Sequence, residues 1–285
     1  MDQRIIELYD EFTHAPLDRR VFMERLIALT GSVAAAEVAL GLLQPNYALA
    51  AIVAENDGRI EIVTGLDAAS GLKTYTALPK GAKLDAAANM VIVVHENRGL
   101  NPHIQDVARR LALAGFPAVA VDMLTPLGGT PADEDAARDM FPKLDLTRAV
   151  ASIVALIDDR KKKTPNIKIG IIGFCWGGGI VNAVATAAPN LDAGVVFYGV
   201  SPRTEDVANI KAKMQLHYAG LDKRINDTVP PYEEALKKAR VKYEIFMYDK
   251  VNHAFHNDTG KERYADAAAK LAWSRTTDFF RSALK

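Results

Sequence analysis

The sequence predicts an α/β fold in which a mostly parallel sheet carries helices on both faces. Stretches of strand and helix character alternate over most of the chain, which is the pattern of such sheets. The apolar run Ile167–Ile172 suits a strand buried on both faces, and the glycine-rich turn after it leads into a helix. Residues 1–50 differ in character, so we expect a helical extension followed by one large domain at 51–285.

The expected strands share short runs of β-branched and aromatic residues, and the first two are expected to pair antiparallel. They span 59–64, 72–78, 90–94, 117–121, 167–172, 193–198, 213–219 and 243–248. The expected helices place apolar residues three or four positions apart, and they span 101–115, 146–161, 176–188, 229–239 and 261–284. Ligands of such sheets bind beyond the carboxyl ends of the strands, so the glycine- and proline-rich loop 124–131 is expected to form the floor or rim of a pocket.

The first fifty residues allow two interpretations. Arg19-Arg20 precedes an alanine-rich apolar stretch at 26–43, and the small residues Ala48–Ala50 suit a signal peptidase, so this segment resembles a twin-arginine export signal. The alternative is a retained extension of two amphipathic helices, at about 3–12 and 18–43, because nearby glutamates fit poorly in an export segment. Both a cytoplasmic and a periplasmic location therefore stay open.

The charge balance and the single cysteine exclude several classes of function. The chain has 35 basic and 35 acidic side chains, so no net field favours nucleic acid or an anionic membrane. Cys175 is the only cysteine, which excludes a disulfide framework and a cysteine-rich zinc site. We expect no metal, no cofactor and no stable membrane association, a small neutral or weakly charged ligand, and a monomer or small homo-oligomer.

Cys175 lies in a turn that has the pattern of a nucleophile elbow. Gly173 and Gly177 flank it in the arrangement Gly-x-Cys-x-Gly, between a buried strand and a helix. Small residues at these positions let strand and helix approach closely while the central side chain is pushed outward. The alternatives are a glycine-rich turn with an inert buried cysteine, or a phosphate-binding loop, although the lysine of such a loop is missing.

A thiol at an elbow needs a base and an acid, which should follow later strands. Asp222 comes directly after the strand 213–219, and His253 lies in the loop after the strand 243–248. We expect these two to complete a triad with Cys175, because position relative to the strands decides the geometry. The competing candidates are His256 for the base and Asp227 or Asp249 for the acid. His217 is expected in the core, and His14, His95 and His103 are expected as surface or supporting groups.

Four motifs stand out along the chain. They are His-Glu-Asn-Arg-Gly-Leu-Asn at 95–101, Gly-Phe-Cys-Trp-Gly-Gly-Gly at 173–179, Gly-Leu-Asp at 220–222 and Asn-His-Ala-Phe at 252–255. With these motifs in this order, the chain resembles the dienelactone hydrolase family over roughly residues 55–285. The carboxymethylenebutenolidase-like members of that family have the α/β-hydrolase fold.

The resemblance implies a role for each matching residue. Cys175 would be the nucleophile, His253 its base, Asp222 the group that orients the histidine, and Glu96 a carboxylate that helps to form the thiolate when substrate arrives. The backbone N–H of Trp176 and that of Asn97 are expected to form the oxyanion hole. The expected reaction is thiolate attack on an ester or lactone carbonyl, followed by hydrolysis of an acyl-thioester.

The sequence departs from the family at the arginines that bind the carboxylate of a dienelactone. The segment 122–126 has no arginine or tyrosine, and the position four residues beyond His253 is Asn257. That substrate would therefore lack its charge-assisted contacts unless Arg98 or Arg203 compensates. The pocket is expected to be mainly apolar, and the predicted lining residues are Arg98, Met123, Leu124, Trp176, Tyr198 and Phe255.

The leading hypothesis is a cysteine-dependent hydrolase of a small carboxylic ester or lactone. One alternative is promiscuous hydrolysis of other electrophiles, such as thioesters or organophosphates, by the same triad. Another is a redox-sensing or ligand-binding protein without enzymatic activity, in which Cys175 is oxidised or buried. The enzymatic hypotheses require the carboxylates and the imidazole to converge on the sulfur, whereas the non-enzymatic hypothesis does not.

Overall fold

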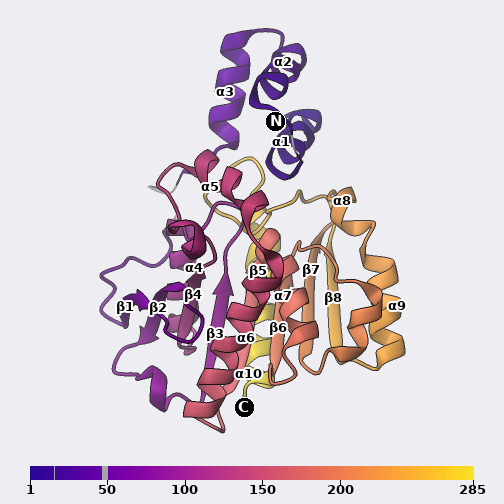
Figure 1. Cartoon of the computed structure of the whole chain (residues 1–285). Helices are drawn as coiled ribbons and strands as arrows, with labels where there is room; N and C mark the ends of the chain where they lie inside the picture. The colour runs from indigo at the N-terminus through magenta and orange to yellow at the C-terminus, as the bar shows by residue number, and fades with distance from the viewer. Residues whose placement is uncertain (16, 47–50) are drawn as a thin grey trace.

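The computed structural model describes residues 1–15, 17–46 and 51–285, and its described strands form one sheet (Figure 1). The order across the sheet is β1-β2-β4-β3-β5-β6-β7-β8. β2 pairs antiparallel with β1 and with β4, and the remaining pairs are parallel. Each predicted strand is confirmed to within two residues; they are β1 (Ile60–Leu66), β2 (Lys73–Pro79), β3 (Asn89–Val94), β4 (Ala118–Asp122), β5 (Lys168–Phe174), β6 (Ala193–Phe197), β7 (Lys213–Ala219) and β8 (Tyr243–Tyr248).

Helices cover both faces of this sheet, as the sequence predicts. α4 (Pro102–Leu113) and α10 (Asp266–Ala283) pack on one face. α6 (Leu146–Lys163), α7 (Trp176–Ala187) and α9 (Val229–Ala239) pack on the other. The middle strands β3, β5 and β6 are buried along nearly their whole length, which explains their near-continuous apolar sequence.

Two short helices were not predicted, and one predicted helix begins later than expected. α5 (Glu134–Met140) is rich in charged residues and lacks an apolar stripe, but the Asp133 carboxylate caps it by accepting from the N–H of Ala136. α8 (Lys223–Asn226) is a single turn. α10 begins at Asp266 because the preceding residues form turns. The short 3-10 turns are η1 (Leu84–Ala86), η2 (Thr125–Leu127), η3 (Phe141–Lys143) and η4 (Thr204–Asn209).

The N-terminal extension folds as three helices, α1 (Gln3–His14), α2 (Arg19–Thr30) and α3 (Val33–Leu43). The expected single helix over 18–43 is wrong because Gly31 ends α2 in the left-handed conformation, with φ at 83°, and Ser32 caps α3. No single described helix is long and apolar enough to cross a membrane; α2 and α3 reach that length only as a pair bent by 109°. The predicted processing stretch, Ala48–Ala50, lies outside the described residues.

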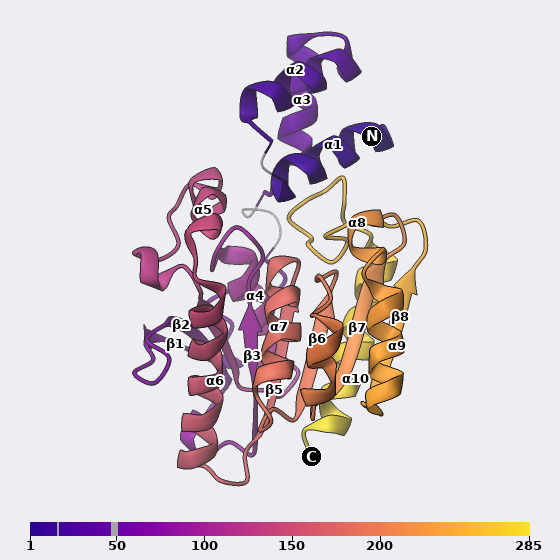
Figure 2. The same cartoon turned by 45° about the vertical axis from the view of Figure 1, so that its right-hand side comes forward.

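These three helices form an N-terminal unit with its own apolar cluster. Phe12 and Phe22 stack with ring centroids 4.2 Å apart inside it. Figures 1 and 2 show the unit above the edge of the sheet where the parallel strands end. Polar and cation-π contacts attach it to the rest of the chain. These are Gln3 to Asn252 at 2.7 Å, Asn97 to the Thr13 carbonyl at 2.7 Å, Arg19 to Asp135 at 2.6 Å and Arg138 over the Phe12 ring at 4.4 Å.

Candidate active site

The turn between β5 and α7 holds Cys175 in a strained conformation. Its φ of 55° and ψ of −116° lie outside the usual regions for a residue with a side chain. The flanking glycines are required by close approach: a Cβ at Gly173 would lie 2.2 Å from the carbonyl oxygen of Gly177, and one at Gly177 would lie 2.4 Å from that of His95. The turn therefore has the geometry of an elbow at the end of a central strand.

Asp222 and His253 come together beside this turn. Asp222 follows β7, and its Oδ2 lies 2.5 Å from Nδ1 of His253 in the loop after β8. The other Asp222 oxygen accepts from the N–H of Ile225, which fixes the carboxylate. The competing residues lie elsewhere: His256 packs against the rings of Phe174 and Phe197, Asp227 pairs with Lys223, and Asp249 is exposed.

A second imidazole, which the sequence analysis placed among surface or supporting groups, reaches the sulfur. Nε2 of His14, the last residue of α1, lies 3.0 Å from Sγ of Cys175. The rings of His14 and His253 meet edge to face, with centroids 4.6 Å apart. Nε2 of His253 is buried and has no hydrogen-bond partner among the described residues. One signal in the sequence was available, since Asp10 precedes His14 by one helical turn, the spacing of an ion pair.

The charges around Cys175 favour its ionised form. Burial raises the pKa of the thiol, but the charges of His14 and His253 outweigh burial and bring the pKa of Cys175 down to about 6. Burial lowers the pKa of His14, but the thiolate and the Asp10 carboxylate together raise that pKa to about 9. The pKa of His253 is raised well above its usual value, because Asp10, Cys175 and Asp222 outweigh its burial. A thiolate flanked by imidazolium groups is the favoured state near neutral pH.

Glu96 is near the sulfur but is held by other groups. Its Oε2 accepts a hydrogen bond from Nδ2 of Asn257 at 2.6 Å, and its Oε1 accepts one from the Tyr198 hydroxyl at 3.4 Å. Among the described residues, no hydrogen bond joins Glu96 to Cys175. Asn257, which lies four residues beyond His253, therefore holds the Glu96 carboxylate.

The residues expected to form the oxyanion hole lie beside the sulfur. Trp176 is the first residue of α7, and the first N–H groups of a helix have no partner within the helix. Asn97 anchors the N-terminal unit through its side chain, which donates to the carbonyl oxygen of Thr13. Asn97 and Trp176 both line the cavity that Cys175 faces. This position is compatible with donation of their backbone N–H groups to a bound oxyanion.

A cavity of about 660 Å³ opens over Cys175, and the N-terminal unit forms one of its walls. Tyr198 and Trp176 line it, as predicted. The other described lining residues come from the segments 12–17 and 138–146, from two single loop positions and from α8; they are Phe12, Thr13, His14, Ala15, Leu17, Asn97, Arg138, Asp139, Phe141, Pro142, Leu144, Leu146, Val200, Arg224 and Ile225.

Three predicted pocket residues do not line this cavity. Met123, Leu124 and Phe255 are buried in the core, with exposed fractions of 1%, 0% and 0%. The loop 124–131 is not a rim either, because the carboxylate of Asp122 folds it back by accepting from the N–H groups of Leu124 and Thr130 at 3.0 and 2.9 Å. Residues 138–146 take its place at the rim.

Arg98 is also not part of the large cavity. Its Nη1 donates to Oδ1 of Asp135 and to the carbonyl oxygen of Glu134, both at 2.9 Å. It borders a smaller cavity of about 20 Å³ that also touches Cys175 and His253. Arg203 pairs with Asp206 on the surface. Arg98 and Arg203 are thus both paired with carboxylates, and the arginines at the large cavity are Arg138 and Arg224.

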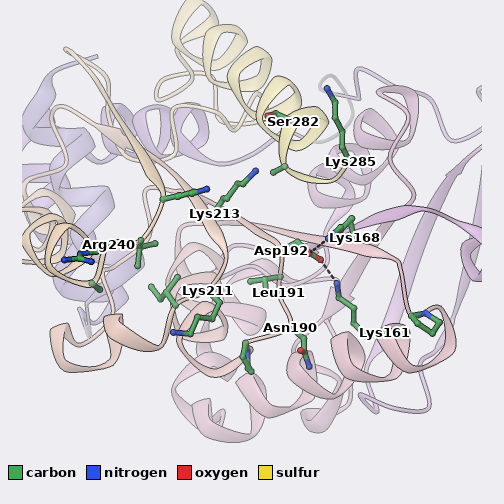
Figure 3. Close-up of a pocket in the computed structure, with 17 residues that line it drawn as sticks. Lys161, Lys168, Asn190, Leu191, Asp192, Lys211, Lys213, Arg240, Ser282 and Lys285 are labelled. Carbon is green, nitrogen blue, oxygen red and sulfur yellow. Dashed lines mark hydrogen bonds and ion pairs between the residues drawn. The ribbon is translucent and has the colours of Figure 1, made fainter.

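Another depression lies at the opposite edge of the sheet, where the strands begin (Figure 3). It is rich in lysines, and no histidine is among its described lining residues. Asp192 accepts from Nζ of Lys161 at 2.5 Å, from Nζ of Lys168 at 3.2 Å and from the N–H of Ile169 at 2.8 Å. These contacts tie the start of β5 to α6, so we assign the lysines a structural and solvating role.

His14, Cys175 and His253 form a compact group. A ring nitrogen of each histidine and Sγ of Cys175 all lie within 4.8 Å of one another. Carboxylates stand behind both histidines, Asp10 behind His14 and Asp222 behind His253. The raised pKa values of the two histidines favour protonated rings, and a protonated ring cannot bind a metal ion. The sequence predicts no metal site, because the chain has one cysteine and its histidines are scattered.

Comparisons with known proteins agree with this fold. A Saccharolobus solfataricus protein named "Putative carboxymethylenebutenolidase" is 30% identical over 251 residues, which cover 75% of this chain and 95% of that protein. One of the same name from Salmonella typhi is 32% identical over 234 residues, covering 73% and 82%. The crystal structure of a "Putative Dienelactone Hydrolase" from Klebsiella pneumoniae superposes with a TM-score of 0.68 at 28% identity, covering 78% of this chain and 98% of that one. Residues 72–284 match the Dienelactone hydrolase family, and the chain therefore belongs to this family of α/β-fold hydrolases.

Proposed function

We propose that this hydrolase cleaves a small carboxylic ester or lactone with Cys175 as its nucleophile. The observation that carries the proposal is the convergence of the elbow sulfur with a buried imidazole that is bound to a carboxylate, at a small cavity that Cys175 and His253 both line. A redox sensor or a ligand-binding protein would have no need of the Asp222–His253 pair. The unpartnered Nε2 of His253 supports a role in proton transfer, because a buried ring nitrogen without a partner is costly unless it is used.

The proposed reaction has two steps. The thiolate of Cys175 attacks the carbonyl carbon, and the backbone N–H groups of Asn97 and Trp176 stabilise the negative charge on the carbonyl oxygen. The carbon–oxygen bond of the ester breaks, and the imidazolium of His253 gives its proton to the leaving alcohol. Neutral His253 then takes a proton from water, which attacks the acyl-thioester and releases the thiolate.

The cavity favours an uncharged acyl group. Its walls include the apolar side chains of Phe12, Leu17 and Phe141. Arg138 is paired with Asp135 and Asp139, so its charge is already neutralised. We therefore place a neutral, partly apolar acyl group here in preference to a dienelactone carboxylate.

The test uses short-chain p-nitrophenyl esters, a δ-lactone, a thioester and an organophosphate triester as substrates for the wild-type protein. We expect turnover of the esters or the lactone, a burst of p-nitrophenol, and an acyl adduct on Cys175 in mass spectra of quenched samples. Prior alkylation with iodoacetamide should remove the turnover. Ester turnover that survives complete alkylation would refute the proposal, and turnover of the triester alone would favour the promiscuous alternative.

A further inference from the structure

The resemblance to the family implies that Glu96 takes the proton of Cys175 when substrate arrives. In the structure, both oxygens of Glu96 accept hydrogen bonds from Asn257 and Tyr198. The group within hydrogen-bond distance of the sulfur is instead His14, at 3.0 Å.

His14 is held in place by its own helix. Its Nδ1 lies 2.8 Å from the carbonyl oxygen of Asp10 and 3.2 Å from Oδ1 of the same residue. Because Nδ1–H donates to Asp10, Nε2 is the nitrogen left to face the sulfur. The side chain of His14 is only 10% exposed. His253 is similar in that its Nδ1 is hydrogen-bonded to the Asp222 carboxylate, so two imidazoles, each with a carboxylate next to Nδ1, flank one thiol.

His14 also lies outside the part of the chain that matches the family, which begins at residue 72. The N-terminal unit that carries it packs around its own apolar cluster and meets the rest of the chain through polar contacts next to the site. The Asn97 side chain, which binds the Thr13 carbonyl, is adjacent in sequence to Glu96 and fixes the end of α1 over the elbow. This placement supports a role for the unit in the site's chemistry as well as in shaping the cavity.

We propose that His14 is a second catalytic histidine, which takes the proton of Cys175 and holds the sulfur as a thiolate before substrate arrives, with Asp10 as its positioning residue. This inference rests on the proposed function and deepens it. The S–H proton moves to Nε2 of His14 and stays there through both steps. The thiolate is then paired with an imidazolium both when it attacks and when it leaves the acyl group, while His253 carries the protons of the alcohol and of water.

The surrounding charges are compatible with this pair. The carboxylates of Asp10 and Asp222 lie next to Nδ1 of the two imidazoles and favour their protonated forms. Arg224 lies farther out, with its Nε 3.9 Å from Oδ2 of Asp10, and partly offsets that carboxylate. The titratable and charged groups that face His14 and Cys175 come from several elements. They are Asp10 from α1, Glu96 and Arg98 from the loop after β3, Tyr198 from the end of β6, Asp222 from the loop after β7, Arg224 from α8, His253 from the loop after β8 and Arg263 from the turns before α10.

The test measures how fast iodoacetamide alkylates Cys175 between about pH 5 and about pH 10, because the rate follows the thiolate fraction. The wild-type rate should rise with an inflection near pH 6, where the thiol ionises. In His14→Gln the inflection should move up by about one pH unit or more, so that the rate near pH 6 falls about tenfold. Glu7→Gln is the matched control, since Glu7 is exposed on the same helix, and it should behave as wild type.

Two further measurements, and the same alkylation profile of Glu96→Gln, make the outcome decisive. Asp10→Asn should also move the inflection of the alkylation profile to higher pH. This variant tests the role of His14 if the His14→Gln protein does not fold. Ester kcat/KM of His14→Gln should fall about tenfold near pH 6.5 and approach that of wild type near pH 9, where less of the wild-type His14 is protonated. An unchanged inflection in His14→Gln, or a shift found only in Glu96→Gln, would overturn the inference. If the wild type hydrolyses no ester, the proposed function fails, while the alkylation profile still reports on His14.

Discussion

Replacing Cys175 with alanine should lower kcat/KM for a p-nitrophenyl ester by about 10⁴-fold or more, to the level of residual binding and oxyanion stabilisation. The sulfur is the only group at the elbow that can form the acyl intermediate, and no other residue of the chain is a cysteine. Cys175→Ser should retain slightly more activity than Cys175→Ala, because its hydroxyl can still be activated by His253 but ionises far less readily than a thiol.

The alanine variant should fold as the wild type does, because it removes one small side chain from the wall of a cavity. Its thermal unfolding curve is the control, and a melting temperature close to that of wild type keeps the loss of activity interpretable. The Cys175→Ala protein should also show no acyl adduct after exposure to ester. Retention of a tenth or more of the wild-type kcat/KM would exclude Cys175 as the nucleophile.

Substitution of Gly173, the glycine before the elbow, should have as large an effect on stability as substitution of Cys175 has on activity. A Cβ at Gly173 would lie 2.2 Å from the carbonyl oxygen of Gly177 and 2.8 Å from a methyl carbon of Val181, and backbone atoms cannot move aside cheaply. We expect Gly173→Ala to lower the free energy of unfolding by about 3 kcal/mol or more, since strand β5 and helix α7 must separate.

Gly65→Ala is the matched control for this variant. Gly65 lies within β1, its φ is not positive, and nothing lies within 4 Å of a Cβ placed there. Its free energy of unfolding should change by less than about 1 kcal/mol. Urea unfolding followed by circular dichroism measures both changes, and similar values for the two variants would show that the approach of strand and helix is not as tight as the structure has it.

The elbow and the Asp222–His253 pair could be predicted from the sequence because both depend on where strands end. In a parallel sheet, the residues that directly follow strands meet at one edge, so Cys175, Asp222 and His253 are placed by chain order alone. The strand bounds follow for the same reason, since buried central strands must be apolar throughout.

The residues that line the cavity could not be predicted in the same way. Met123 and Leu124 follow a strand and looked like lining residues, but Asp122 binds the next turn and folds them into the core. His14 is separated from Cys175 by 161 residues and belongs to a helix whose docking depends on isolated polar contacts such as that of Asn97. Helical periodicity reveals which face of α1 is apolar, but not which group its last residue meets.

The position of His14 in the first helix determines when Cys175 can ionise readily as the newly made chain folds. The first helix leaves the ribosome long before the loop that carries His253, and both must dock before the sulfur gains its two cationic neighbours. Until then Cys175 is an ordinary thiol, mostly protonated at neutral pH and slow to oxidise. Cys175 therefore becomes sensitive to oxidation only when the site is assembled. A nascent or misfolded chain is protected from this oxidation, and the folded protein is not.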